Sequence, residues 1–474
     1  MESESGFNLY EKSIKDVGGT KIALVRARDG RDMLYASAGC PIRFEGCYNA
    51  GEGVVCPLTY ANVRLLMDVF PYLRPVPVGS KGISFGFGDR LGMATPGHVR
   101  AVSGSGFFPV FAQQSIREMQ RTKRTPEDVM ISAVTGVLKE GYENGFGADA
   151  DHLKRLEDVD YVLPYGYSMF TCDPSDYVNN GVGFMSAEGL RKEFETLMDY
   201  KDILDRYNGK SFKFGDQVLE FDEMDVVRAA VKYYRAIVFA AQMFRKIRES
   251  VDGSFDFEIS VDETDEPTSY KEHIFIVSEL RRLEVGFTGI ALRFIGEFHK
   301  GVDYIGDLVE FEESVKVHRA IVKEFGPYRI SVHSGSDKLT IYPILGSYFD
   351  GFLHVKTAGT SYLEALKVVA KRSPSLFVEV YNYSLQRFDE DKKSYYINVD
   401  KSALPDISKV DKGDYLSLLE DGNVRQMLHV TYGSVLTSAL RDKLLSLIID
   451  FEDDYYAFLE YHFRRHIKAL RGGV

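Results

Sequence analysis

The sequence predicts an α/β fold: a (β/α)8 TIM-type barrel with an N-terminal extension, a long insertion after the fourth strand and a helical C-terminal tail. Between residues 82 and 372, a short apolar run that ends in polar residues occurs eight times. Several of these runs precede an amphipathic helix. Repeats of a strand and a helix are typical of a parallel sheet covered by helices, and eight of them can close a barrel. A doubly wound open sheet is the alternative.

The eight predicted strands follow one another at uneven intervals, because residues 174–254 form an insertion after the fourth strand. The strands lie in GISFGFGDR from Gly82, FFPVFAQQS from Phe107, GFGADADH from Gly145, YSMFTCDP from Tyr167, FDFEISVDET from Phe255, FTGIALRF from Phe287, YRISVHSGSD from Tyr328 and GFLHVKTAG from Gly351. Apolar residues at intervals of three and four predict helices at 118–139, 224–249, 270–283, 308–325 and 361–371.

The chain divides into three predicted parts. Residues 81–373 form the catalytic barrel with its insertion. Residues 1–80 hold the strand-like segment KIALVRAR and the helix-like segment ANVRLLMDVF, and we expect this extension to pack on the barrel. Residues 374–474 are acidic and rich in Tyr, and they end in a helical segment that begins at SALRDKLL. This last helix is expected to serve packing or oligomerisation, so a homo-oligomer is possible.

Composition excludes several classes of protein. The 58 Lys and Arg residues stand against 70 Asp and Glu, and the net charge of −12 argues against a nucleic-acid binder. The first residues, MESESGFNLYEKSIKD, are polar, and no stretch approaches roughly 18 apolar residues, so we expect a cytoplasmic protein without membrane contact. Its four cysteines are expected to be reduced thiols. The Gly-rich segments lack the P-loop and dinucleotide fingerprints, so nucleotides are not expected.

Polar side chains gather where the predicted strands end. In a barrel, these ends and the following loops form the active site. Imidazole and carboxylate groups that converge there from different strands can bind a divalent transition metal with positions left for substrate oxygens. The candidates are Asp149, Asp151, His152, Asp173, Glu258, Asp262, Glu263, Arg293, Glu297, His299, His333, Ser334, Ser336, Asp337, His354 and Lys356.

Several of these residues also have structural interpretations. A single His at a strand end is often a hydrogen-bonded structural residue, and Asp173 before Pro174 is typical of a helix cap. If the strand face that carries Glu258 points into the barrel, this carboxyl is desolvated, has a raised pKa and is available for proton transfer. If the face points outward, Glu258 forms a salt bridge under a helix. Lys356 could form a Schiff base or bind a substrate carboxylate.

Seven segments resemble the tagaturonate/fructuronate epimerase family, whose relatives include tagatose 4-epimerases. The resemblance covers residues 82–370, and HSGSDK and HVKTAGTSYLEAL are its specific motifs. The segments are FGDRLGMATPGH, PVFAQQSIREMQRTKRTPEDV, GADADHLK, SVDETDEPTS, GEFHKGVDYIGD, SVHSGSDKLTIYP and HVKTAGTSYLEAL.

This resemblance implies a cytoplasmic, divalent-metal-dependent epimerase that interconverts D-tagaturonate and D-fructuronate. It implies Asp151 as the proton acceptor and Glu258 as the proton donor. It also implies His152, His299 and His333 as ligands of Mn, Co, Ni or Zn, with Glu297 as the alternative to His299. The residues expected to bind the anionic sugar-acid substrate are Lys356, Arg293, Asp262, His354 and Gln113.

The chemistry of such an epimerisation explains why two acid/base groups are wanted. The inverted carbinol carbon lies β to the ketone, so the carbonyl does not acidify its C–H bond. We therefore expect retro-aldol cleavage: a base takes the hydroxyl proton, the adjacent carbon–carbon bond breaks, and the aldehyde fragment rotates and adds again on its other face. A second group then returns a proton to the oxygen.

Two other functions compete with this hypothesis. The first is a barrel aldolase or an aldose–ketose isomerase, acting on a sugar or sugar acid through a metal or a Lys356 imine. The second is a non-catalytic sugar-acid-binding protein on the same barrel. The density of His, Asp and Glu at the strand ends disfavours the second, because buried charges cost several kcal/mol unless function retains them.

Overall fold

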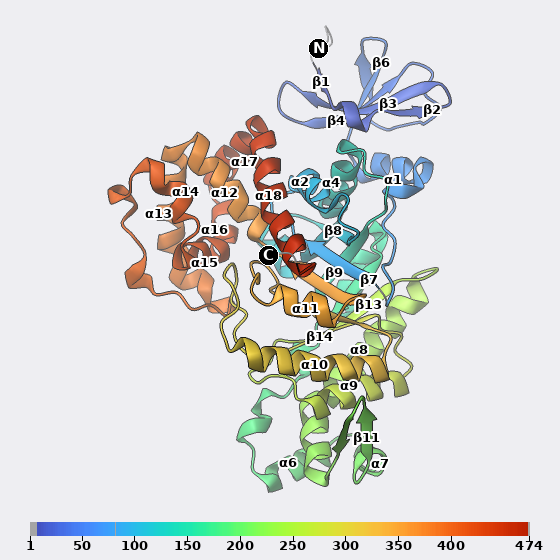
Figure 1. The fold of residues 1–474 in the computed structure, drawn as a ribbon. Coiled ribbons are helices and arrows are strands. Elements are labelled where there is room, and N and C mark those ends of the chain that lie inside the picture. Colours follow the sequence, from blue (N-terminus) through green and yellow to red (C-terminus); the bar gives the residue numbers. More distant parts are fainter. Residues whose placement is uncertain (1–6, 81, 473–474) are drawn as a thin grey trace.

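The fold, a computed structural model that describes residues 7–80 and 82–472, is built around a closed eight-stranded parallel barrel (Figure 1). All eight predicted runs form its strands, and the alternative of an open sheet is wrong because the last strand pairs with the first. The strands are β7 (Gly82–Phe87), β8 (Phe108–Ser115), β9 (Gly147–Leu153), β10 (Met169–Cys172), β13 (Asp256–Val261), β14 (Gly289–Leu292), β15 (Arg329–Val332) and β16 (Phe352–Thr357).

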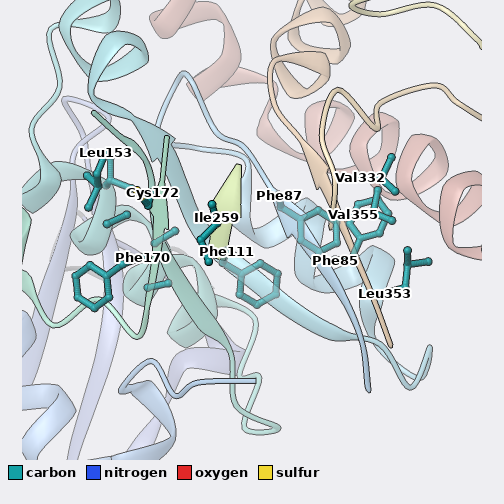
Figure 2. Close-up of a cluster of buried hydrophobic side chains, with 14 of the residues drawn as sticks. Phe85, Phe87, Phe111, Leu153, Phe170, Cys172, Ile259, Val332, Leu353 and Val355 are labelled. Atoms are coloured by element: carbon teal, nitrogen blue, oxygen red, sulfur yellow. The ribbon is translucent and has the colours of Figure 1, made fainter. Parts of the chain in front are cut away.

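Alternation along the strands separates an apolar outer face from a charged interior. Figure 2 shows part of the apolar side, where Phe85 and Phe87 of β7 lie beside Val355 of β16. The residues that directly precede Phe85 and Val355 on the same strands, Ser84 and His354, hydrogen-bond to each other inside the barrel. Because successive side chains of a strand point to opposite faces, each strand delivers both packing residues and polar residues.

Helices cover the outside of the barrel, and four of the five predicted ones are present within a residue or two. They are α8 (Glu223–Ser250), α9 (Tyr270–Arg282), α10 (Leu308–Phe325) and α12 (Thr360–Arg372). The helix predicted at 118–139 is two helices, α3 (Ile116–Thr122) and α4 (Pro126–Lys139). Lys123 adopts a left-handed conformation with φ 55°, which ends α3, and Thr125 starts α4 with a capping box. The remaining barrel helices are α2 (Thr95–Val102), α5 (Leu156–Val162) and α11 (Tyr342–Tyr348).

The segment between β10 and β13 contains α6 (Ala187–Phe194), α7 (Tyr200–Tyr207) and the hairpin β11 (Ser211–Phe214) and β12 (Gln217–Glu220) before α8. Asp222 caps α8 with a capping box. Helix α8 contacts α9 and α5 beside the barrel, and α6 and α7 contact α8. These smaller elements therefore lie beyond α8, at the end of the molecule opposite the N-terminal sheet (Figure 1).

The N-terminal residues form an antiparallel sheet followed by α1 (Tyr60–Val69). Its strands are β1 (Phe7–Leu9), β2 (Lys15–Val17), β3 (Thr20–Ala27), β4 (Asp32–Ser37), β5 (Tyr48–Ala50) and β6 (Gly53–Pro57). The prediction that all cysteines are reduced is wrong at Cys47 and Cys56, which form a disulfide. Pairing of β5 with β6 places these two residues opposite each other, with Cα atoms 4.1 Å apart. Cys40 and Cys172 are free thiols.

The C-terminal residues form a helical layer against one side of the barrel (Figure 1). The predicted terminal helix is two helices, α17 (Leu440–Asp450) and α18 (Glu452–Leu470). Helix α18 contacts α2, α11 and α12, and the Phe463 ring meets the rings of Phe85 and Phe87. The others are α13 (Pro374–Asp391), α14 (Tyr415–Leu418), α15 (Gly422–Val430) and α16 (Tyr432–Leu436). None of the helices in the described ranges is long and apolar enough to cross a bilayer.

Candidate active site

A cavity of about 710 Å³ opens at the carboxyl ends of the barrel strands. Seven of the ten residues predicted to act in catalysis, metal binding or substrate binding line it, although they come from six different strands and their loops. They are Gln113, Asp151, His152, Asp262, Arg293, His333 and Lys356. Glu258, His299 and His354 are not among the lining residues and are buried nearby. The barrel therefore brings the predicted strand-end residues to one place, as parallel strands require.

Lys356 is the centre of an ionic network at the floor of this cavity. Its Nζ lies 2.7 Å from Asp149, 2.8 Å from Asp151 and 2.9 Å from Glu258, and it also donates to the Thr171 hydroxyl. Burial alone would lower the pKa of this ammonium, but the three carboxylates raise it well above its ordinary value. Lys356 is therefore charged and fully partnered, which disfavours both roles predicted for it.

Glu258 points into the barrel, which is the first of the two orientations that the sequence allowed, and its side chain is fully buried. The prediction of a raised pKa is wrong. Burial raises the pKa of this carboxyl, but the Lys356 ammonium and the hydrogen bond from His333 outweigh burial and lower it well below its usual range. The carboxylate Oε2 has no hydrogen-bond partner within the described chain. Glu258 is thus an ionised acceptor, one of whose oxygens is free.

His333 lies between two carboxylates, with Nε2 2.8 Å from Glu258 and Nδ1 3.2 Å from Asp262. Although burial opposes protonation, these carboxylates raise the pKa of His333 to about 10. The imidazolium therefore carries a proton on Nε2 that it shares with Glu258. For Asp262, the same ion pair outweighs the effect of burial and lowers the pKa far below its usual value.

His152 lies beside His333, with ring centroids 5.0 Å apart. Its Nδ1 is 2.8 Å from the Asp151 carboxylate. Burial raises the pKa of Asp151, but His152 and Lys356 lower it well below its ordinary value, so Asp151 is ionised. His152 also has φ 52°, a left-handed conformation that is rare for a residue with a side chain. Strain of this kind gathers at functional sites.

The donor atoms around His152 suit a divalent transition metal. Ligand atoms of His152, Asp173 and Glu263 all lie within 4.8 Å of one another, and His333, whose ring centroid is 5.0 Å from that of His152, is not part of this group. Imidazole nitrogen with carboxylate oxygen is the donor set that such ions prefer. The Lys154 ammonium, 3.4 Å from Asp173, partly neutralises these acids.

The third predicted ligand, His299, has a different environment. Its ring stacks on Tyr396 with centroids 4.8 Å apart, and its Nε2 lies 4.0 Å from Glu297. Among the described residues, the structure does not gather ligand atoms of His152, His299 and His333 within 4.8 Å of one another. Glu297, the alternative ligand, lines the cavity and lies 3.6 Å from the Arg293 guanidinium.

The other two predicted substrate-binding residues meet at the wall of the barrel. His354 Nδ1 lies 2.8 Å from the Ser84 hydroxyl, and its Nε2 is buried without a hydrogen-bond partner among the described residues. Gln113 lines the cavity, and both ends of its buried amide lack protein partners within the described chain. A Cβ at Gly86 would lie 1.7 Å from Gln113 Oε1, so this strand position requires glycine. The Gln113 amide is therefore available to bind a polar ligand.

Sequence reasoning missed three kinds of lining residue. Arg117 lies in the first turn of α3, Lys300 follows the predicted ligand His299, and Tyr395 and Tyr396 belong to the C-terminal part of the chain. The position of Lys300 in a strand-end loop was a usable signal. Residues as distant as Tyr395 and Tyr396 gave no local signal, because only tertiary packing brings them to the barrel mouth.

Comparison with known proteins gives a consistent result. A family model described as tagaturonate epimerase (UxaE) matches residues 10–470. A tagaturonate/fructuronate epimerase from Thermotoga maritima is 45% identical over 476 residues, which is 98% of each chain. Native and glycerol-complexed structures of the fructuronate-tagaturonate epimerase UxaE from Cohnella laeviribosi match with a TM-score of 0.93 at 35% identity, over 98% of this chain and 96% of theirs.

These matches extend over the barrel, the N-terminal sheet and the C-terminal helices alike. A family model that covers nearly the whole chain, together with identities of 45% and 35% over almost the full length of the relatives, shows the relationship directly. The chain belongs to the tagaturonate epimerase family of isomerases.

Proposed function

We propose that this protein interconverts D-tagaturonate and D-fructuronate. The observation that carries the proposal is a pair of ionised carboxylates, Asp151 on β9 and Glu258 on β13, that lie 2.8 and 2.9 Å from the same Lys356 ammonium at the floor of the cavity. Two acid/base groups from different strands are what an inversion at a carbinol carbon needs. The relatives named above are epimerases of this substrate pair by name.

The proposed reaction is a retro-aldol cleavage followed by aldol addition. Asp151 takes the proton of the hydroxyl on the carbinol carbon, the bond from this carbon toward the ketone breaks, and the bonding electrons pass to the ketone side of the substrate. The aldehyde fragment rotates and the same carbon–carbon bond forms again on its opposite face. Glu258, the proposed proton donor, then protonates the new alkoxide, and the Lys356 ammonium, 2.8 Å from Asp151 and 2.9 Å from Glu258, passes the proton taken by Asp151 on to Glu258.

We propose that the protein uses a divalent metal ion, Mn, Co, Ni or Zn. His152 and His333 would hold it, with His299 or Glu297 as a further ligand. When bound, such an ion would stabilise negative charge on the substrate oxygens. Because Glu258 and Asp262 raise the pKa of the His333 imidazole, we expect binding of a metal to this residue to release a proton.

The direct test is an NMR measurement of D-tagaturonate incubated with the metal-loaded protein. Signals of D-fructuronate should grow until the two sugars reach equilibrium, and their absence would contradict the proposal. Binding of D-tagaturonate without turnover or metal would instead support the non-catalytic alternative. In heavy water, the retro-aldol route leaves the inverted carbon without deuterium, whereas direct proton exchange at this carbon introduces it.

An aldolase that works through a Lys356 imine is the closest alternative. An imine needs a neutral amine with free space around it, and the Lys356 ammonium is surrounded by three carboxylates. Borohydride reduction in the presence of substrate should therefore leave Lys356 unmodified, and a trapped adduct would favour the alternative. The cytoplasmic location, the absence of nucleic-acid partners and a homo-oligomeric state stay predictions from the sequence.

A further inference from the structure

Cationic side chains in the cavity wall differ in how they are neutralised. Six Lys and Arg side chains line the cavity, and four of them have carboxylate partners within the protein. Arg90 pairs with Glu118 at 2.8 Å, Lys356 with the three carboxylates above, Arg293 with Glu297 at 3.6 Å and Lys393 with Glu390 at 2.7 Å. The other two, Arg117 and Lys300, form no ion pair with any residue that the structure describes.

Arg117 and Lys300 both line the cavity, and no ion pair among the described residues relieves the repulsion between their like charges. Arg117 belongs to α3, and Lys300 follows β14, so two separate elements bring them to the same cavity wall. Two cations that line one cavity without an ion pair to any carboxylate of the described residues suit an anion, although the Glu118 and Glu263 carboxylates also line this cavity.

Both side chains are held in place by neutral groups. The Lys300 ammonium donates a hydrogen bond of 2.7 Å to the Ser334 hydroxyl, and Ser334 directly follows His333. The Arg117 guanidinium lies over the Tyr395 ring, 5.5 Å from its centroid. Tyr395 in turn accepts a hydrogen bond of 2.5 Å from Arg121. The Lys300 ammonium thus contacts the residue next to His333 in the sequence. The Tyr395 ring orients the Arg117 guanidinium without neutralising its charge.

We propose that Arg117 and Lys300 bind the carboxylate of the substrate and select a sugar acid over the neutral sugar of the same configuration. This rests on the proposed epimerase function, because it places a uronate in the cavity. The guanidinium can bind a carboxylate with two parallel hydrogen bonds, and the ammonium adds a third. Tyr395, from the C-terminal part of the chain, is a positioning residue for Arg117.

This assignment replaces the two cations that the sequence suggested for the same role. A substrate carboxylate next to Lys356 would meet Asp149, Asp151 and Glu258, which repel it. Arg293 is already partly neutralised by Glu297. The net charge of the protein is −12, so local cations that are not neutralised by a carboxylate are needed to attract an anionic substrate.

The test compares D-tagaturonate with D-tagatose, which has a hydroxymethyl group in place of the carboxylate. For Arg117→Gln and Lys300→Met, kcat/KM with D-tagaturonate should fall about 10- to 100-fold, mainly through KM, because each variant loses a hydrogen bond to a charged group. Activity with D-tagatose should change by less than about 3-fold. Calorimetric binding of both sugars should show the same loss of preference, and thermal unfolding checks that each variant is folded.

Two further variants complete the design. Lys393→Gln removes a cation that has its own carboxylate partner, so the preference for the acid should stay as in the unmodified protein. Arg293→Gln tests the rival assignment. Equal losses for both sugars in the Arg117 and Lys300 variants, or a lost preference in Arg293→Gln alone, would overturn the subsite. A chain that binds D-tagaturonate through these two residues without converting it would contradict the epimerase and not the subsite.

Discussion

The Nε2 atom of His333 lies 2.8 Å from Oε1 of Glu258, although their strands, β15 and β13, are separated in the barrel by β14. This contact joins a predicted metal ligand to the predicted proton donor. A ligating His usually donates its second N–H to a carboxylate, which fixes the orientation of its ring. A metal bound at His333, as proposed above, would therefore share this imidazole with the proposed proton donor.

Glu258→Gln tests the proton donor. The amide has nearly the size of the carboxyl and can still accept from His333, but it cannot pass on a proton. We expect kcat to fall about 10²- to 10⁴-fold while the bound metal content is unchanged. Steady-state kinetics and elemental analysis of the same preparation measure both quantities. A near-normal rate would contradict this role for Glu258, and Glu263, which also lines the cavity, would be the next residue to test.

Metal removal tests the cofactor. Incubation with a chelator should abolish epimerisation, because the substrate oxygens then lose their electrophilic partner, and addition of Mn²⁺, Co²⁺, Ni²⁺ or Zn²⁺ should restore it. Metal content and activity are measured on the same samples before and after dialysis. Full activity in a preparation shown to be free of metal would disprove the metal dependence.

Lys356→Met tests the ionic network at the floor of the cavity. Removal of the ammonium leaves three buried carboxylates without their shared cation, so we expect the free energy of unfolding to fall by about 3–5 kcal/mol. Lys409→Met is the matched control, because the Lys409 side chain is 82% exposed and its loss should change stability by less than about 0.5 kcal/mol. Urea unfolding measures both. Similar stability in the two variants would show that the network is not needed for folding.

Glu364 in α12 makes stability depend on pH. Its side chain is fully buried, and burial raises its pKa from 4.5 to about 7 even though the Lys367 ammonium lies 3.1 Å away. The folded chain keeps this proton at pH values where the unfolded chain has released it. Stability therefore falls as the pH rises from about 4.5 to about 7, by roughly 3 kcal/mol at about 1.4 kcal/mol per pKa unit.

Glu364→Gln should remove this pH dependence, because the amide does not titrate. Urea unfolding of both proteins at several pH values between 4.5 and 8 measures the difference. If the two stability curves run parallel across this range, the carboxyl of Glu364 is not protonated in the folded chain.

Phe463→Ala tests whether α18 is part of the barrel core. The Phe463 ring is fully buried against Phe85 and Phe87 of the first barrel strand, so its truncation should cost about 3–5 kcal/mol. Tyr461→Ala on the same helix removes a ring that is 66% exposed and should cost less than about 0.5 kcal/mol. Equal effects on the melting temperature would contradict the core role of α18.

The barrel and much of its site could be predicted because they depend on local patterns. Each strand is a short apolar run, and alternation along the strand decides which side chains face inward. The carboxyl ends of parallel strands must meet at one end of a barrel, so the sequence alone could predict that Asp151, His152 and His333 lie close together. The disulfide between Cys47 and Cys56 depends on the register of β5 and β6, which their spacing alone did not reveal.

The sequence determined which polar residues stand at the ends of the barrel strands. The tertiary structure decided whether each of these groups is charged and which partners it has. The sequence indicated Lys356 as a cation at a strand end. Three carboxylates from other strands pair with its ammonium, so it is not available to bind the substrate carboxylate as predicted. The sequence left two orientations of Glu258 open; the structure points it into the barrel, where its neighbours lower the pKa that such a carboxyl was expected to have raised. Arg117 and Lys300 are distinguished only by the absence of a carboxylate partner among the described residues. The physical reason is that Coulomb interactions and desolvation act through space, between groups that are far apart along the chain.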